Sequence, residues 1–261
     1  MYHAITFKNA YSQKNTWNSW HMVPSSRPVI NPPSVKSRTV DIPGGNGQLD
    51  LTESLTGYPT YSNRTGSIEF IVVNDLNWQN PNHDEWYKLY TNVMSYLHGQ
   101  KLTMILEDDP EYYYDGRFSV NSWKTDKNNS KITIDYNVAP FKRLNRSSVD
   151  DQWLWDPFNF QTGVILSSIF KNISLNTTAQ VFRFGPDAVG DAPFEAVFTA
   201  SVASKVQFND GNGFSSWISL AANTPLTVSA RKSWQSGNIV MQAKTDSGTG
   251  LLSIDFYQGR F

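Results

Sequence analysis

Short runs in which apolar and polar residues alternate make up most of this 261-residue chain, and Pro and Gly separate them. Because successive side chains of a β-strand point to opposite faces, such alternation predicts strands with one buried face. The segment before residue 60 also excludes a long helix, because it contains six prolines. They are Pro24, Pro28, Pro32, Pro33, Pro43 and Pro59. We therefore expect a mainly β chain of the α+β class.

One stretch, "HDEWYKLYTNVMSYLHG", has the period of an α-helix instead. Its apolar residues fall on one helical face. They are Trp86, Leu89, Tyr90, Val93, Met94 and Leu97. Asp84 and Glu85 favour the positive N-terminal end of a helix, and Gly99 suits the left-handed residue that follows its last turn. This is the single α-helix that the sequence predicts.

The chain is expected to form two domains. Residues 1–142 predict an N-terminal domain that resembles a β-sandwich and carries a long hairpin and the helix. Residues 143–152, "RLNRSSVDDQ", are polar and lack periodicity, which is typical of a linker. Residues 153–261 contain many short alternating runs separated by hairpin turns such as "NDGNG" and "DSGTG", which predicts a C-terminal β-sandwich.

Composition and charge exclude several function classes. The net charge is −1, so no overall field favours binding to nucleic acid or to an anionic membrane. The chain has no cysteine, which excludes disulfides, thiolate metal ligands and a cysteine nucleophile. The N-terminus alternates rather than forming an apolar run, and no segment reaches the length of a spanning helix. We expect synthesis in a cytoplasm and no membrane association.

Five carboxylates crowd the stretch "ILEDDPEYYYDGRFSV", between two alternating runs. Asp109-Pro110 and Asp115-Gly116 are both turn-forming pairs, so the stretch predicts a β-hairpin with a solvated acidic tip. The spacing of its acids does not fit a calcium loop. Nor do neighbouring acids on a tip provide the separated carboxylate pair of a glycosidase.

No other catalytic, metal or cofactor motif is found. None of the four histidines has the spacing of a zinc motif on a helix, and no G-x-S-x-G nucleophile elbow occurs. "PGGNG" lacks the G-K-[ST] of a phosphate loop and predicts a tight turn between Ile42 and Leu49. We therefore expect a protein that is not an enzyme and that has no cofactor.

Tryptophans leave one alternative open. Trp17 with Trp20, Trp153 with Trp155, and the isolated Trp217 and Trp234 could form a platform for stacking sugars, or could pack in cores. For Trp217 and Trp234 both sugar stacking and core packing stay open. The alternative function is therefore a carbohydrate-binding module in the C-terminal sandwich that recognises a host cell-wall polysaccharide.

An ordered series of motifs adds a resemblance to a known family. The chain carries "VDIPGGNGQLDLTESLTG", then "YSNR" at residues 61–64, then the helix ending "LHGQK", then "DDPEYYYDGR" and "APFK". In this order the motifs resemble the distal tail protein (Dit) family of long-tailed phages and prophages of Gram-positive bacteria. The likeness covers residues 1–142; the rest is similar to the family's galectin-like sandwich in size and strand pattern.

The resemblance implies a structural protein of the virion tail tip. Members form a homo-hexameric ring, a hub that joins the tail tube protein to the tail-associated tip protein and often to receptor-binding proteins. It implies assembly in the bacterial host cytoplasm, and a channel through which DNA passes without a nucleic-acid binding site. A closed ring needs a head-to-tail interface, which pairing between exposed strand edges can supply.

Residues that match the family's motifs are expected to shape turns and ring contacts. They are Lys36, Asp41, Pro43, Gly44, Gly47, Asp50, Arg64, Asp109, Tyr113, Gly116 and Arg117. Arg64 and Arg117 are the two expected to form charge-assisted hydrogen bonds across an interface.

Overall fold

The protein divides into two compact units, Met1–Lys142 and Arg143–Phe261. A computed structural model describes residues 2–73, 84–124, 130–150, 170–209, 211, 213–232 and 237–261. Each unit has its own hydrophobic core, as expected of an independent domain. The described residues are mostly strands with few helices, which confirms the mainly β class.

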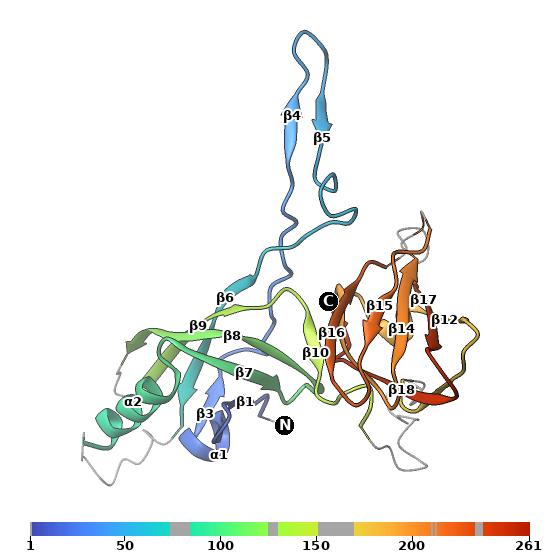
Figure 1. Ribbon diagram of the computed structural model, residues 1–261. Helices are drawn as coiled ribbons and strands as arrows, with labels where there is room; N and C mark the ends of the chain where they lie inside the picture. Colours follow the sequence, from blue (N-terminus) through green and yellow to red (C-terminus); the bar gives the residue numbers. More distant parts are fainter. Residues whose placement is uncertain are drawn as a thin grey trace. The chain divides into compact units, whose positions relative to one another are not determined.

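One antiparallel sheet dominates the first unit, with the strand order β2-β1-β7-β8-β9-β6-β3 (Figure 1). Its strands are β1 (Ile5–Lys8), β2 (Gln13–Asn15), β3 (Met22–Pro24), β6 (Arg64–Val72), β7 (Gln100–Leu106), β8 (Asp109–Lys124) and β9 (Ser130–Val138). The edges of the sheet are thus β2 and β3, two strands of three residues each.

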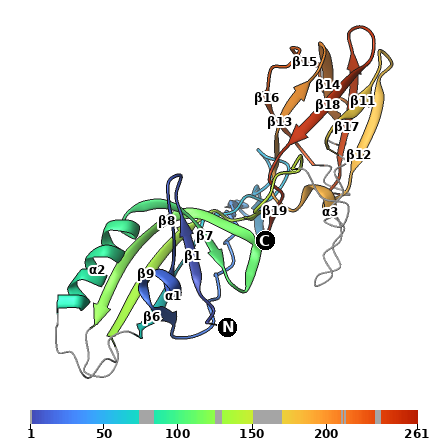
Figure 2. The same cartoon turned by 90° about the horizontal axis from the view of Figure 1, so that it is seen from below.

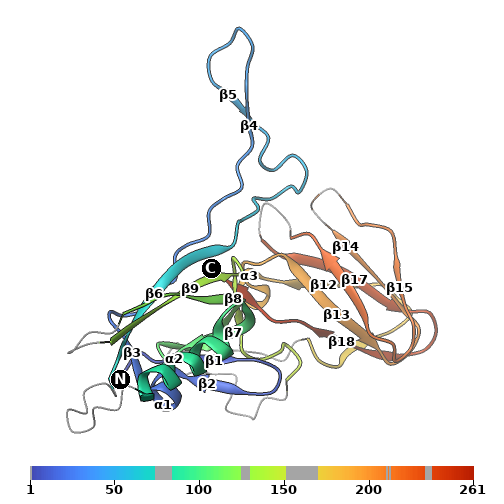
Figure 3. The same ribbon diagram turned by 90° about the vertical axis from the view of Figure 1, so that its left-hand side faces the viewer.

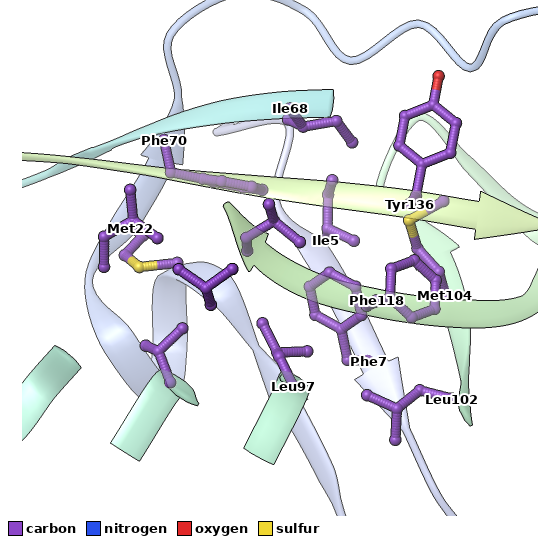
Figure 4. Packing of buried hydrophobic residues seen from close by; sticks show 14 of the residues in the cluster. Ile5, Phe7, Met22, Ile68, Phe70, Leu97, Leu102, Met104, Phe118 and Tyr136 are labelled. Atoms are coloured by element: carbon purple, nitrogen blue, oxygen red, sulfur yellow. The ribbon is translucent and has the colours of Figure 1, made fainter. Parts of the chain in front are cut away.

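Alternation in the sequence correctly predicts which face of this sheet is buried. In β9 and β6 the apolar residues at every second position, beginning at Ile132 and Ile68, are all buried. They are Ile68, Phe70, Val72, Ile132, Ile134, Tyr136 and Val138. Figure 4 shows Phe7, Phe118, Met104 and Leu97 among the side chains that pack together in this core. The hydrophobic effect on this face holds the long strands together.

The predicted helix is present as α2 (Asp84–Leu97), which packs on β7 and β8 (Figure 2). Val93 and Leu97 are fully buried, and Gly99 has the expected positive φ of 72°. The side chains of Asp84, Glu85 and Trp86 lie outside what the structure describes. No helix among the described residues is long and apolar enough to cross a membrane.

The prediction of a single helix misses two short ones. In α1 (Thr16–Trp20) the side chain of Asn15 accepts hydrogen bonds from the N–H groups of Trp17 and Asn18, which caps the helix. The other is α3 (Pro186–Val189), in the second unit. A helix of four or five residues shows too little of the 3.6-residue period to be seen in a sequence.

The acidic stretch forms a hairpin, but neither predicted pair forms its turn, because Asp109 and Pro110 already lie in β8. β7 ends at Leu106 and β8 begins at Asp109, so only Glu107 and Asp108 form the tip. The prediction that Asp115-Gly116 is a turn is wrong, since both residues lie inside β8 and pair with β7. Long pairing with two neighbouring strands outweighs the local turn preference of Asp-Gly at this point.

Two four-stranded antiparallel sheets make up the second unit, with the orders β11-β18-β13-β16 and β12-β17-β14-β15. The strands are β11 (Ile173–Leu175), β12 (Gln180–Phe184), β13 (Phe194–Ala200), β14 (Ser204–Asn209), β15 (Ile218–Leu220), β16 (Leu226–Ala230), β17 (Ile239–Thr245) and β18 (Gly250–Asp255). Residues of both sheets share one core, which makes this unit a β-sandwich.

Residues 143–150, the described part of the expected linker, hydrogen-bond within the second unit. β10 (Lys142–Leu144) pairs with the C-terminal strand β19 (Gly259–Arg260), and Leu144 is buried. The Ser148 hydroxyl donates to the Ile254 carbonyl oxygen and accepts from the Phe256 N–H. Residues 151–169, with the expected start of the C-terminal domain, lie outside the described residues.

Candidate assembly surface

A hairpin with no core beneath it is the most exposed part of the first unit. Residues 34–62, called the arm below, connect β3 to β6 and contain the two-stranded sheet β4 (Thr39–Asp41) and β5 (Gln48–Asp50). Figures 1 and 3 show the arm rising away from the main sheet beside β6. Backbone hydrogen bonds link its two legs, from Lys36 N to Thr60 O and from Ser62 N to Ser34 O, both 2.8 Å long.

The arm carries apolar side chains that the described residues leave uncovered. Val40 pairs with Leu49 across the hairpin, yet these side chains are 47% and 54% exposed. Leu55 is 82% exposed, and Val35 and Ile42 are nearly half exposed. An isolated two-stranded hairpin is marginally stable in water, and contiguous exposed apolar residues mark interaction sites. The arm therefore has the character of a segment that packs against another surface.

Glycines and polar side chains together form the turn of the arm, as expected for the "PGGNG" motif. Gly44 and Gly47 have φ values of 72° and 89°, in the left-handed region that glycine adopts without strain. The Gln48 side chain donates to Asp41 Oδ1 at 2.8 Å. Hydrogen bonds from the side chain and backbone of Thr52 hold the pKa of Asp50 below its ordinary value. These motif residues shape the hairpin, together with Pro43 in its loop.

The base of the arm adjoins a strand edge that is only partly covered. β3 pairs with residues 70–72 of β6, whereas β9 pairs with all nine residues. Along the rest of this edge, Ser25 N donates to Glu69 O and the Asn31 side chain donates to Thr65 O. Within the described residues no strand lies beside this part of β6. An open edge of this kind can pair with another chain.

Arg64 does not have the role expected of it. Its side chain is buried, with 5% of its surface exposed, and it donates from Nε to Pro140 O at 2.8 Å and from Nη1 to Asn31 O at 3.3 Å. The guanidinium also lies over the Tyr114 ring, 5.7 Å from its centroid, and burial lowers its pKa. We therefore correct the expectation of a bond across an interface: Arg64 ties together distant segments of its own unit.

Arg117 and Gly116 also act inside the chain. Arg117 is exposed and donates from Nη1 to the carbonyl of Gly99 at 3.0 Å, just after the end of α2, where a cation is favoured. The guanidinium of Arg117 is exposed, so its expected contact across an interface stays a prediction. Gly116 lies so close to β9 that an added Cβ would come within 2.3 Å of Asn137 O. Its role is close packing between strands rather than a turn.

The acidic hairpin tip holds the N-terminus and the segment that precedes the arm. Asp108 accepts from His3 Nδ1 at 2.8 Å and from Arg27 Nε at 2.9 Å. These bonds, first that of His3, lower the pKa of Asp108. Next to it, Asp109 accepts from Lys142 Nζ at 2.7 Å, and Tyr113 is half-buried in β8. The acids thus hold segments of the first unit together.

Motif residues therefore gather in two places rather than at one site. Lys36, Asp41, Pro43, Gly44, Gly47 and Asp50 lie on the arm, and Asp109, Tyr113, Gly116 and Arg117 lie along β8. Sequence reasoning missed the exposure of Val40, Leu49 and Leu55. The alternation around "PGGNG" was the available signal, but alternation does not distinguish a hairpin on a core from one that projects from it.

Of the two candidate sugar-binding tryptophans in the second unit, Trp217 lies among the described residues. Trp217 is partly exposed, and Lys244 Nζ lies 4.8 Å from its ring centroid, so the chain's own cation occupies one face of the indole. Trp153, Trp155 and Trp234 lie outside the described residues. In the first unit Trp20 is buried, and Trp17 stacks on Tyr2 with ring centroids 4.1 Å apart.

No group of three His, Asp or Glu side chains that could hold a metal occurs in the part of the chain that the structure describes. The carboxylates of Asp108 and Asp109 are paired with basic side chains of the same unit. Among the described residues, the apolar side chains of the arm and part of the β6 edge are left uncovered.

Comparison with solved structures finds the same arrangement in a phage protein. The crystal structure of the Dit protein (gp 19.1) of phage SPP1 matches this chain with a TM-score of 0.56 and 10% sequence identity. The match covers 97% of this chain and 98% of that one. This chain has a Dit-like fold.

The likeness spans both units of the Dit-like fold, because nearly the whole of each chain is aligned. No family model and no curated protein matches the sequence. At 10% identity the shared feature is the fold, not the side chains. The SPP1 protein is described as a paradigm of the hub of the adsorption apparatus in phages that infect Gram-positive bacteria.

Proposed function

We propose that this protein is a structural hub of a phage or prophage tail tip, assembled as a closed homo-hexameric ring. The exposed arm is the observation that carries the proposal, because its apolar residues need a partner that the described chain does not provide. The likeness to the SPP1 hub protein over nearly the full chain supports the same role. The proposal assigns no chemical reaction and no cofactor to the chain.

The placement of these surfaces supports a head-to-tail ring. The arm and the open edge of β6 lie at one side of the sheet, and β2 and β1 lie at the other. Contacts between two different surfaces repeat around a circle and close when the rotation permits. We propose that the arm of each copy packs on its neighbour, and that the ring connects the tail tube protein to the tail-associated tip protein and to receptor-binding proteins.

Mass measurement across a concentration series tests this proposal. Light scattering of the purified chain should show a species of about six times 29.5 kDa, and negative-stain images should show a central hole. The double variant Val40→Asp, Leu49→Asp should shift the protein to the monomer, because charge replaces apolar arm surface. Val181→Asp, on an exposed position of the sandwich, is the control and should leave the ring intact.

A hexamer that survives the double arm variant would contradict the role given to the arm. A monomer at every concentration, with tail tube protein present as a template, would contradict the ring itself. Denaturation curves of each variant show whether the first unit is still folded, and they should be unchanged because Val40 and Leu49 lie outside its core.

Carbohydrate binding by the second unit is the second candidate, since Trp217 remains partly exposed on the sandwich. The test is a wall-polysaccharide pulldown with the full chain and with Trp217→Ala and Trp234→Ala. Loss of binding in either variant would support it, and no binding by the unaltered chain would exclude it. The lysine over the Trp217 ring makes this the weaker candidate, because it leaves less of the indole for a sugar to stack on.

A further inference from the structure

A small pocket opens in the first unit at the β2 end of its main sheet. It has a volume of about 220 Å³ and lies against β1, β2, β7 and α1. Its walls include Tyr2, Thr6, Asn15, Trp17, Asn18 and Glu107. In the sheet order, β2, β1 and β7 form one end, whereas the arm leaves from between β3 and β6 at the other.

The chemistry of the pocket fits a cation with a flat face. Tyr2 and Trp17 are stacked, with an angle of 17° between their planes, and Tyr2 is 54% exposed. Glu107 Oε2 accepts from the backbone N–H of Ala4 at 2.8 Å, and Glu107 is exposed. A guanidinium combines stacking on aromatic rings with hydrogen bonds to a carboxylate, which is what these walls offer.

The amide of Asn15 does not compete for such a guest. Its Oδ1 caps α1, and its Nδ2 donates to Thr6 Oγ1 at 3.0 Å. These bonds fix the wall of the pocket and leave Glu107 as its charged group. The pocket is therefore shaped before a ligand arrives, which lowers the entropic cost of binding.

The arm carries a matching side chain. Arg38 is exposed immediately before β4, and no hydrogen bond or ion pair of its guanidinium occurs within the described residues. Its backbone is fixed, because its N–H donates to Thr52 Oγ1 at 3.0 Å and its carbonyl accepts from Leu51 N at 2.8 Å. Val40 lies two residues further along β4 and so points to the same side of the strand.

We propose that this pocket receives Arg38 from the arm of a second copy of the chain. The inference rests on the proposed head-to-tail ring, in which one end of each sheet meets the opposite end of the next. The Arg38 guanidinium stacks on the Tyr2–Trp17 pair and hydrogen-bonds to Glu107. Each ring then contains the same contact once per interface, and it fixes the register of the arm on its neighbour.

Cysteine cross-linking of the full chain tests the contact directly, because the natural sequence has no cysteine. Asn18→Cys puts a thiol at the rim of the pocket and Ser37→Cys puts one next to Arg38, and both positions are exposed. A short bis-maleimide should convert the double variant into a ladder of covalent oligomers. The control pair, Asn18→Cys with Ser219→Cys on the second unit, should give no ladder.

Glu107→Gln tests the charge while keeping an oxygen that accepts the Ala4 N–H. This variant and Arg38→Gln, each in the Asn18→Cys, Ser37→Cys background, should slow cross-linking by about tenfold, the size expected for a hydrogen bond to a charged group. Combining the two should slow it no further, because both remove the same interaction. Glu53→Gln on the arm is the control for a general change of charge.

The outcomes separate the pocket from the ring. A hexamer by light scattering, with cross-linking no faster than in the control pair, would overturn the pocket and leave the ring standing. Absence of both the hexamer and the ladder would overturn both proposals. Additive effects of Glu107→Gln and Arg38→Gln would mean that the two residues act at separate places, and would also overturn the assignment.

Discussion

Replacing Arg64 by Met should destabilise the first unit without acting through an interface. The side chain donates two hydrogen bonds to backbone carbonyls, those of Pro140 and Asn31. A hydrogen bond to a charged group contributes about 1.5–3 kcal/mol, so the pair contributes about 3–6 kcal/mol. Met has a similar length and no charge, so it fills the space but leaves both carbonyls without this donor.

Part of this loss is offset, because the guanidinium is itself costly to bury. Its Nη2 has no hydrogen-bond partner, and burial without a partner costs about 1–3 kcal/mol, which Met does not incur. These figures leave a loss of about 0–5 kcal/mol, so the expected net effect of Arg64→Met is a free energy of unfolding lower by about 2.5 kcal/mol, the middle of that range. Urea denaturation at low protein concentration measures it on the dissociated chain.

The control for this prediction is Arg117→Met. It also removes an arginine from a strand of the main sheet, β8, but from an exposed position. It should change the free energy of unfolding by less than about 1 kcal/mol, because it breaks one exposed bond, to Gly99 O. If Arg64→Met left monomer stability unchanged and only weakened the oligomer, the assignment of Arg64 to the interior would be refuted, and the expectation of an interface bond would stand.

Three further predictions concern other parts of the fold. Gly116→Ala should lower the free energy of unfolding by about 1–3 kcal/mol, because its Cβ would collide with Asn137 O and Val138. Gly185→Ala should have little effect, because its Cβ would meet only Asn238 Oδ1 at 3.9 Å. Urea titration compares the two variants. Asp108 has a lowered pKa, so it stabilises the fold above its ordinary pKa of about 3.9, and this contribution is lost as the pH falls through the lower, folded value. Thermal unfolding midpoints of the natural chain and Asp108→Asn should thus differ near neutral pH and converge as the pH falls through the lowered pKa of the folded state; a constant difference would contradict this. Burial lowers the pKa of Lys232 to about 8, so stability should rise as the pH increases from about 8 to about 10.4, and in Lys232→Met this rise should disappear from the midpoints.

Alternation of residue types was sufficient to predict the central strands. Ile132, Ile134, Tyr136 and Val138 were expected on one face and are buried together, because a two-residue period leaves no other register that hides them. The strand β12, "QVFRF", has a weaker pattern, although Phe182 and Phe184 alternate with Val181 and Arg183. A run of five residues that contains an outward Val has no clear polar face, so the pattern does not separate it from a loop.

The candidate site could be predicted only in part, for physical reasons that differ between residues. The glycines of "PGGNG" were assigned to a turn because positive φ is a local property of the backbone. The burial of Arg64 depends on Pro140, 76 residues away, and on Tyr114 in another strand, and a single sequence does not show such contacts. Asp115-Gly116 was assigned to a turn because local preference was the only information available at that position.

The arm has a consequence for how the number of copies in an assembly is controlled. An open row of head-to-tail copies always leaves one arm in water, however long the row becomes, so each added copy transfers the uncovered Val40, Leu49 and Leu55 to the new end. Closure into a circle buries that last arm within one assembly, where the effective concentration of its acceptor is high. In the proposed ring, incomplete rows should therefore be rare at equilibrium, and intermediates with fewer copies than the full ring should be short-lived.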